Sequence, residues 1–123
     1  MQFSPLINNI PVTCLGIKSA SEISSILSTS LVSFFNYPLE YLTKSTIFAA
    51  YCAHKFLPIG IWYEGQNLDS LVAGKNYWLG DRYQQKMNIS DGHIVADNAY
   101  KWYEKHNLSA QAHTFMKYIC FQQ

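Results

Sequence analysis

The sequence predicts a mostly α-helical fold, a compact single-domain bundle of about five helices that spans residues 1–123. The chain has the length of one domain and contains no linker-like stretch. Hydrophobic residues make up 49% of it and charged residues only 14%, which is enough apolar material for one core and excludes a disordered chain. Several segments also combine a helix-capping residue with apolar residues spaced three and four apart, the pattern of amphipathic helices.

The first twenty residues predict an extended arm, because Pro5 and Pro11 disfavour a helix, with a short strand near residues 10–17. A helix is then expected to begin at Ser19, since Ser19 and Glu22 have the spacing of a capping box. Its apolar stripe, expected to be buried, consists of Ile23, Ile26, Leu27, Leu31 and Phe34.

A second helix is expected after Pro38, because proline suits the first turn of a helix, and it should end before Pro58. Apolar residues on more than one of its sides predict that this helix lies at the centre of the core. A second short strand is expected near residues 59–63. A short helix should follow at residues 68–73 and stop at Gly74.

The last third of the chain predicts two amphipathic helices. Ser90 is the expected N-cap of the first helix, Asn107 is expected to end it in a left-handed conformation, and Ser109 is expected to cap the second. Because the connection is short, the two helices should lie side by side and antiparallel. The segment from Asn76 to Met87 is interrupted by Gly80, although Asp81 could cap a helix within it, and it fits a helix and a loop equally well.

The charge of the chain bears on which partners it could bind, and its cysteine content bears on the cellular compartment in which it could reside. Nine basic residues against eight acidic ones give a net charge of +1, and Arg82 is the only arginine, so no nucleic-acid partner is expected. Three dispersed cysteines, Cys14, Cys52 and Cys120, favour reduced thiols in a cytoplasmic protein over a disulfide framework. No stretch has the roughly 20 apolar residues of a bilayer span, and the amino terminus lacks the basic start of a signal peptide.

No motif predicts a metal site or a cofactor. The sequence has no closely spaced Cys or His pairs of the kind that bind zinc, and its glycines do not form a phosphate-binding loop. His106 and His113 flank the predicted turn between the last two helices, but two ligands do not make a metal site. We therefore expect neither a metal nor a cofactor.

One catalytic arrangement stays open. A nucleophile, a base and a residue that orients the base are the parts of a thiol hydrolase or transferase, and Cys14, His93 and Asp97 follow that order. Nothing near Cys14 indicates a lowered thiol pKa, such as a helix start beside it. This enzyme hypothesis is the alternative to the one below.

The middle of the chain is rich in aromatic and polar residues, a composition shared by domain cores and by protein interfaces. The residues expected to contact a partner are Trp62, Tyr63, Tyr77, Trp78, Asp81 and Arg82. The leading hypothesis is a small non-enzymatic interaction protein that binds and inhibits or neutralises a partner protein, such as a toxin or an enzyme, in the manner of bacterial immunity proteins. A carrier of a small apolar ligand held between helices is a third hypothesis.

Overall fold

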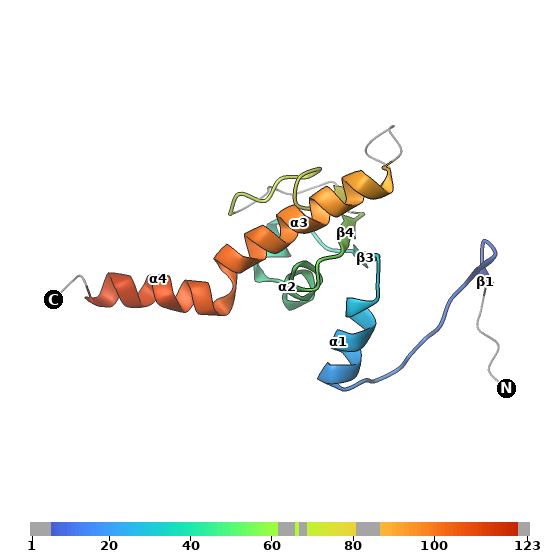
Figure 1. The fold of residues 1–123 in the computed structure, drawn as a ribbon, viewed down its shortest axis with the longest axis horizontal. Helices are drawn as coiled ribbons and strands as arrows, with labels where there is room; N and C mark the ends of the chain where they lie inside the picture. Colours follow the sequence, from blue (N-terminus) through green and yellow to red (C-terminus); the bar gives the residue numbers. More distant parts are fainter. Residues whose placement is uncertain (1–5, 62–65, 67–68, 81–86, 121–123) are drawn as a thin grey trace.

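The computed structural model describes residues 6–61, 66, 69–80 and 87–120, and it shows a mixed α/β fold (Figure 1). In this part of the chain a three-stranded parallel sheet packs against helices, while a small antiparallel hairpin lies apart from the sheet. The predicted all-helical bundle is therefore wrong. The error arose because short strands buried by helices carry no long alternating pattern.

The sheet has the strand order β3 (Val32–Phe35), β4 (Leu57–Gly60) and β5 (Trp78–Leu79), and both pairings are parallel. Phe35 lies opposite Gly60 across the first pair. A Cβ atom at Gly60 would come within 2.5 Å of two ring carbons of Phe35, so glycine is needed there for the ring to lie over the sheet.

Helix α1 (Ala20–Ser28) begins with the predicted capping box, in which the Ser19 amide donates to Glu22 Oε2 at 2.7 Å. The helix ends earlier than predicted. The Ser28 hydroxyl donates to the Ser24 carbonyl and the Ser30 hydroxyl donates to the Ile26 carbonyl, both at 2.8 Å, and such bonds compete with helix continuation. The segment that follows is β3, where exposed and buried side chains alternate.

The predicted stripe is consequently divided between two elements and is not buried. Ile23 and Ile26 on α1 are exposed, as are Leu31 and Phe34, while Phe35, outside the stripe, enters the core. The branched and aromatic residues of β3 suit a pleated strand, and pairing with β4 outweighs their helical spacing.

The predicted second helix is also divided. A 3₁₀-helix, η1 (Leu39–Lys44), precedes α2 (Thr46–Ala53), and Ser45 separates them by accepting a hydrogen bond from the Phe48 amide at 3.0 Å. The prediction that this region supplies the central helix is confirmed for α2, because Phe48 and Cys52 are fully buried.

Other local predictions need correction. The expected strand at residues 59–63 is β4, which begins at Leu57 and contains Pro58. At residues 10–17 only β2 (Ile10–Pro11) is extended in a sheet, where it pairs with β1 (Leu6–Ile7) through a turn. No helix occupies the described residues 69–73, because Asp69 and Ser70 have positive φ angles of 52° and 66°. Of the ambiguous segment 76–87, residues 76–80 and 87 are described; none of them is helical, and two of them form the short strand Trp78–Leu79.

Helix α3 (Ile89–His106) covers the sheet and has the amphipathic character predicted for it, with Val95, Ala99 and Trp102 buried. Its N-cap is Asn88 instead of Ser90: the Asn88 side chain accepts a hydrogen bond from the Asp91 amide at 2.8 Å.

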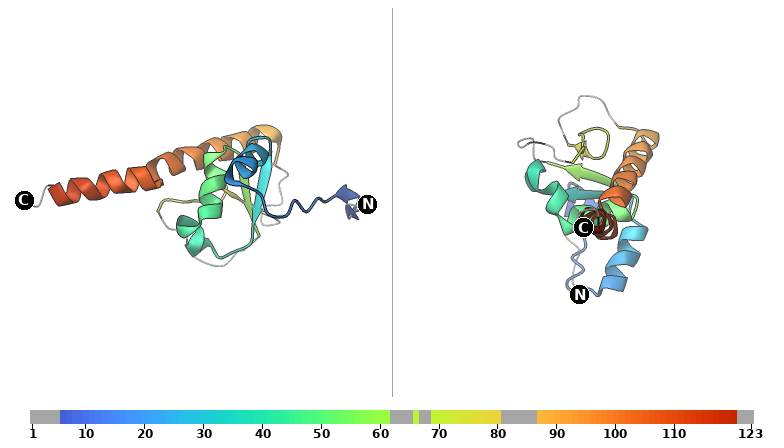
Figure 2. Two further views of the ribbon diagram at one scale, coloured as in Figure 1. Left: turned by 90° about the horizontal axis from the view of Figure 1, so that it is seen from below. Right: turned by 90° about the vertical axis from the view of Figure 1, so that its left-hand side faces the viewer.

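Helix α4 (Leu108–Cys120) continues away from the body of the molecule and does not fold back along α3 (Figures 1 and 2). Asn107 has φ −67° and ψ 166°, an extended conformation instead of a left-handed one. Its side chain caps α4 in the place predicted for Ser109, accepting from the Ala110 amide at 2.8 Å. An extended hinge leaves the two helices end to end, so the antiparallel prediction is wrong.

The core is an aromatic cluster between the sheet, α2 and α3. Phe48 of α2 lies at its centre, with ring centroids 5.7 Å from Phe35, 5.8 Å from Trp102 and 6.4 Å from Tyr77. The hairpin arm and α4 extend from this body toward opposite ends of the molecule, and α1 lies at its periphery (Figure 2).

Candidate functional site

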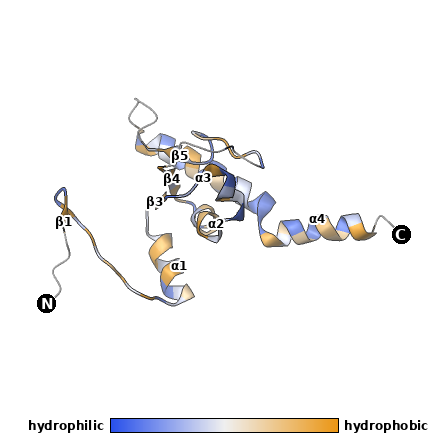
Figure 3. Ribbon diagram, turned by 180° about the vertical axis from the view of Figure 1, so that it is seen from behind, coloured by the Kyte–Doolittle hydropathy of each residue, from blue (hydrophilic) through white to orange (hydrophobic). Residues whose placement is uncertain are grey.

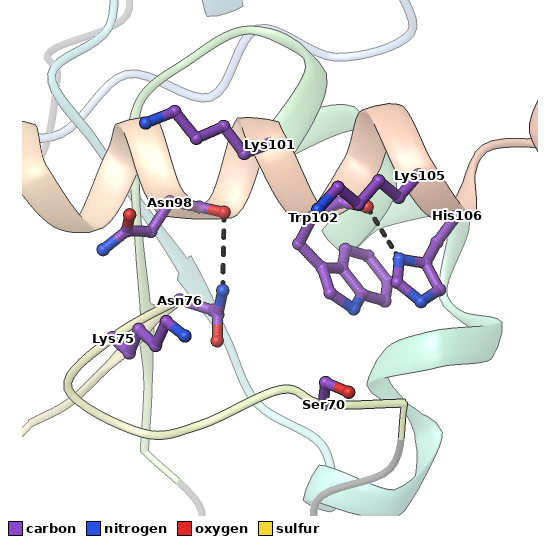
Figure 4. A pocket seen from close by; sticks show the side chains of 8 residues that line it. All are labelled: Ser70, Lys75, Asn76, Asn98, Lys101, Trp102, Lys105 and His106. Carbon is purple, nitrogen blue, oxygen red and sulfur yellow. Dashed lines mark hydrogen bonds between the residues drawn. The ribbon is translucent and has the colours of Figure 1, made fainter.

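A pocket of about 340 Å³ lies between α3 and the loop of residues 69–76 (Figure 4). Both walls contribute polar and cationic side chains. The lining residues are Asn98, Lys101, Trp102, Lys105 and His106 from α3, and Ser70, Lys75 and Asn76 from the loop.

Two side chains attach the loop to the helix and thereby shape the pocket. The Trp102 indole Nε1 donates to the Asp69 carbonyl at 2.8 Å. The Asn76 side chain, only 4% exposed, donates to the Asn98 carbonyl at 3.4 Å and accepts from the Val72 amide at 2.9 Å. Because a buried carboxamide without partners is costly, Asn76 holds the loop in one conformation.

His106 forms one end of the pocket. Its ring stacks on Trp102 with centroids 4.6 Å apart and planes 12° apart. Nδ1 lies 2.8 Å from the Trp102 carbonyl, so Nδ1 carries a proton that it donates. Nε2 forms no hydrogen bond with the described residues and is the nitrogen left for a ligand.

The pocket is cationic. Lys75, Lys101 and Lys105 line it, no carboxylate of a described residue does, and none of the three lysines forms an ion pair with another described residue. Sequence analysis overlooked this site because Lys101 and Lys105 fall on the polar side of a predicted amphipathic helix, where exposed charges are ordinary. The i,i+4 spacing of these two lysines could have indicated an anion site, because like charges at that spacing repel one another unless an anion lies between them.

A second feature is the apolar surface of the peripheral elements. Neither α1 nor α4 contains a buried residue. The hydropathy colouring shows apolar residues along both helices and the arm (Figure 3). On α4 the exposed apolar side chains include Leu108, Phe115, Met116 and Ile119, which recur at helical spacing.

The six predicted partner contacts have different places in the structure. Trp62, Tyr63, Asp81 and Arg82 lie outside the described residues. Tyr77 is fully buried in the aromatic core, where a partner cannot reach it. Trp78, in β5, is half-buried.

The proposed catalytic set is not assembled in the structure. Cys14 is exposed in the segment between the hairpin and α1, while His93 and Asp97 are exposed on α3, and no hydrogen bond joins these three side chains. The arm that carries Cys14 projects away from α3 (Figures 1 and 2). Burial raises the pKa of the Cys52 thiol to about 12, so Cys52 is not an activated nucleophile.

A serine and a histidine do meet, and sequence analysis did not anticipate the pair. Ser24 Oγ of α1 lies 2.9 Å from His54 Nε2, and His54 Nδ1 lies 2.7 Å from the Ala50 carbonyl. Nδ1 therefore carries the proton that it donates to the Ala50 carbonyl, and Nε2 shares a hydrogen bond with the Ser24 hydroxyl. Neither Ser24 nor His54 lines a described pocket, so we interpret the pair as the hydrogen bond that holds α1 against α2.

Within the described residues, no three His, Cys, Asp or Glu side chains come together as a metal site. None of the described helices combines the length and the apolar character needed to cross a bilayer. Comparisons of the chain with models of protein families, with curated proteins and with solved structures found no match.

Proposed function

We propose that this protein is a small non-enzymatic interaction protein that binds and inhibits or neutralises a partner protein. The observation that carries the proposal is its exposed surface. A compact monomer of 14.1 kDa is expected to expose about 6,700 Å². The chain exposes 9524 Å², roughly 2,800 Å² more than that expectation.

The excess area is large enough for a stable complex. A standard protein interface buries about 800 Å² on each partner, so the excess is roughly three times what one such interface requires. Many large hydrophobic side chains are exposed, and contiguous exposed apolar patches are typical of interaction sites.

The stability of α4 supports the same proposal. An isolated helix of fewer than about 12–15 residues is marginal in water and depends on packing of its apolar face. With 13 residues, none of them buried, α4 has no apolar face covered by the part of the chain that the structure describes. A partner that covers Phe115 and Ile119 would supply it.

An inhibitor or immunity protein needs a binding surface and no reaction chemistry, which agrees with the separation of Cys14 from His93 and Asp97. A cytoplasmic location belongs to the proposal, and the three free cysteines support it.

A pair of adjacent substitutions tests the apolar face of α4. Phe115→Asp places a charge on the apolar face, whereas Thr114→Asp places the same charge near the opposite side of the helix. The tagged wild-type protein is used to isolate its partner from native extract. The partner is identified by mass spectrometry, purified, and titrated with each form by calorimetry.

We expect Phe115→Asp to weaken binding by about thirtyfold or more, equivalent to about 2 kcal/mol at a central contact. Thr114→Asp should bind within about threefold of wild type, and the wild-type complex should suppress the partner's activity. Equal binding by both variants would refute the assignment of α4, and light scattering that shows a homodimer formed through Phe115 would refute a separate partner.

Trp78→Ala tests the contribution of the aromatic segment. Because Trp78 is half-buried at the edge of the sheet, its loss should weaken binding by about 2 kcal/mol or more if a partner contacts it. A folded Trp78→Ala variant that binds the purified partner as tightly as wild type would remove this residue from the interface.

A further inference from the structure

We propose that the pocket between α3 and residues 69–76 binds a small phosphorylated compound through its lysines. This inference is independent of the partner surface, because the pocket lies on the body of the molecule and the apolar faces lie on its peripheral elements (Figures 1 and 4).

The charge of the pocket is the first argument. Lys101 and Lys105 are one helical turn apart, and Lys75 approaches from the opposite wall, so like charges are gathered in one hollow. Like charges at positions i and i+4 of an exposed helix repel one another and destabilise the helix. Asp97 and Glu104 on the same helix are exposed, do not line the pocket and form no ion pair with these lysines. A bound anion would remove the repulsion.

The rigidity of the pocket is the second argument. The bond from Trp102 to the Asp69 carbonyl and the bond from buried Asn76 to the Asn98 carbonyl fix the distance between the walls. A ligand that enters preformed walls loses less binding free energy to ordering of the protein.

The donors and the volume define the ligand class. Lysine ammonium groups bind phosphate as point charges, and the Ser70 hydroxyl and the Asn98 carboxamide add hydrogen-bond donors in the lining. A volume of about 340 Å³ is near the lower end of small-molecule sites, which suits a di- or triphosphate or a phosphorylated metabolite. Because lysines line both walls and no carboxylate of a described residue does, a multiply charged phosphate is favoured over a single carboxylate.

The side chains do not contribute equally. Lys75 and Lys105 line opposite walls of the pocket, with Lys105 running along α3 beside Trp102, whereas the end of Lys101 is directed along α3 and away from the loop (Figure 4). Lys75 and Lys105 are therefore the residues to substitute, and exposed Lys18, in the segment before α1, supplies a control with the same change of charge.

The experiment is calorimetric titration of the full chain with inorganic pyrophosphate, with ATP and with hexaglutamate at low ionic strength. We expect saturable binding of pyrophosphate to wild type, about tenfold weaker binding for Lys75→Gln and for Lys105→Gln, and a change within about twofold for Lys18→Gln. Lys105→Arg should restore most of the affinity. Thermal melts of each variant establish that it is folded.

The ATP titration distinguishes the sources of the phosphate. Tighter binding of ATP than of pyrophosphate assigns the pocket to nucleotides, and similar affinities assign it to the phosphate groups alone. The proposal is overturned by the absence of saturable pyrophosphate binding, by equal losses in Lys18→Gln and Lys75→Gln, or by hexaglutamate that binds as tightly as pyrophosphate.

Discussion

The indole of Trp102 donates a hydrogen bond of 2.8 Å to the backbone carbonyl of Asp69, 33 residues earlier in the chain. This single bond joins α3 to a loop in which Asp69 and Ser70 both have left-handed backbone conformations. The same indole packs on Phe48 in the core, and the His106 ring stacks on it. Trp102 therefore couples the stability of the domain to the shape of the cationic pocket.

Trp102→Phe should lower the free energy of unfolding by about 1–3 kcal/mol, because it removes the bond to Asp69 and part of the buried ring. Urea denaturation measures this loss. Tyr103→Phe is the control, since the Tyr103 hydroxyl forms no hydrogen bond with the described residues, and it should change stability by less than about 0.5 kcal/mol. Similar losses in the two variants would show that the indole bond contributes nothing.

Asn88→Ala should destabilise the protein by about 1 kcal/mol, because the Asn88 side chain caps α3 through the Asp91 amide. Ser90→Ala should have almost no effect, since Ser90 lies inside the helix and is exposed. Thermal or urea unfolding of the two variants distinguishes the observed cap from the one that the sequence pattern favoured. A larger loss in Ser90→Ala would contradict the observed start of α3.

Phe48→Ala and Phe115→Ala remove the same side chain from two helices. Phe48 is 0% exposed at the centre of the core, and its loss should cost about 3–5 kcal/mol. Phe115 is 64% exposed, so its loss should change the unfolding free energy of the isolated protein by less than about 0.5 kcal/mol. Chemical denaturation provides both values, and a large loss in Phe115→Ala would mean that α4 packs on the body in solution.

Stability should fall at alkaline pH because of Cys52. Burial raises the pKa of this thiol from an ordinary value of 9.0 to about 12. The contribution is fully present below about pH 9 and is lost as the pH rises toward 12, because the unfolded chain releases the proton first. The expected slope is roughly 1 kcal/mol per pH unit.

Urea unfolding at about pH 8 and about pH 10 measures this slope, and Cys52→Ala should reduce it. Tyr37 and Tyr51 also have raised pKa values, caused mainly by burial, and they act in the same direction at still higher pH. Thiol labelling gives an independent check, since exposed Cys14 and Cys120 should react in the folded protein and Cys52 only after unfolding. An alkaline slope that is unchanged in Cys52→Ala would contradict a buried thiol.

Sequence reasoning succeeded where a feature depends on neighbours in the chain. The Ser19 and Glu22 capping box needs residues three apart, and the buried face of α3 repeats every three or four positions, so both could be identified from spacing. It failed at β3, because the choice between helix and strand there is made by pairing with β4, 25 residues away for Val32 and Leu57. The cationic pocket was missed for a similar reason. Lys75 and Lys105 line the same pocket only because the loop of residues 69–76 is attached to α3.

By itself, therefore, the sequence determined the Ser19 capping box, the amphipathic face of α3 and the supply of apolar residues for a core around α2, all of which are local properties of the chain. Tertiary structure decided which apolar stripes are buried. Val95 and Trp102 are buried against the sheet and a second helix. Phe115 and Ile119 have an equally regular spacing but are exposed, and no other described element covers them. The physical reason is that periodicity shows which side of a helix avoids water, but the surface that covers that side belongs to another segment or to another molecule.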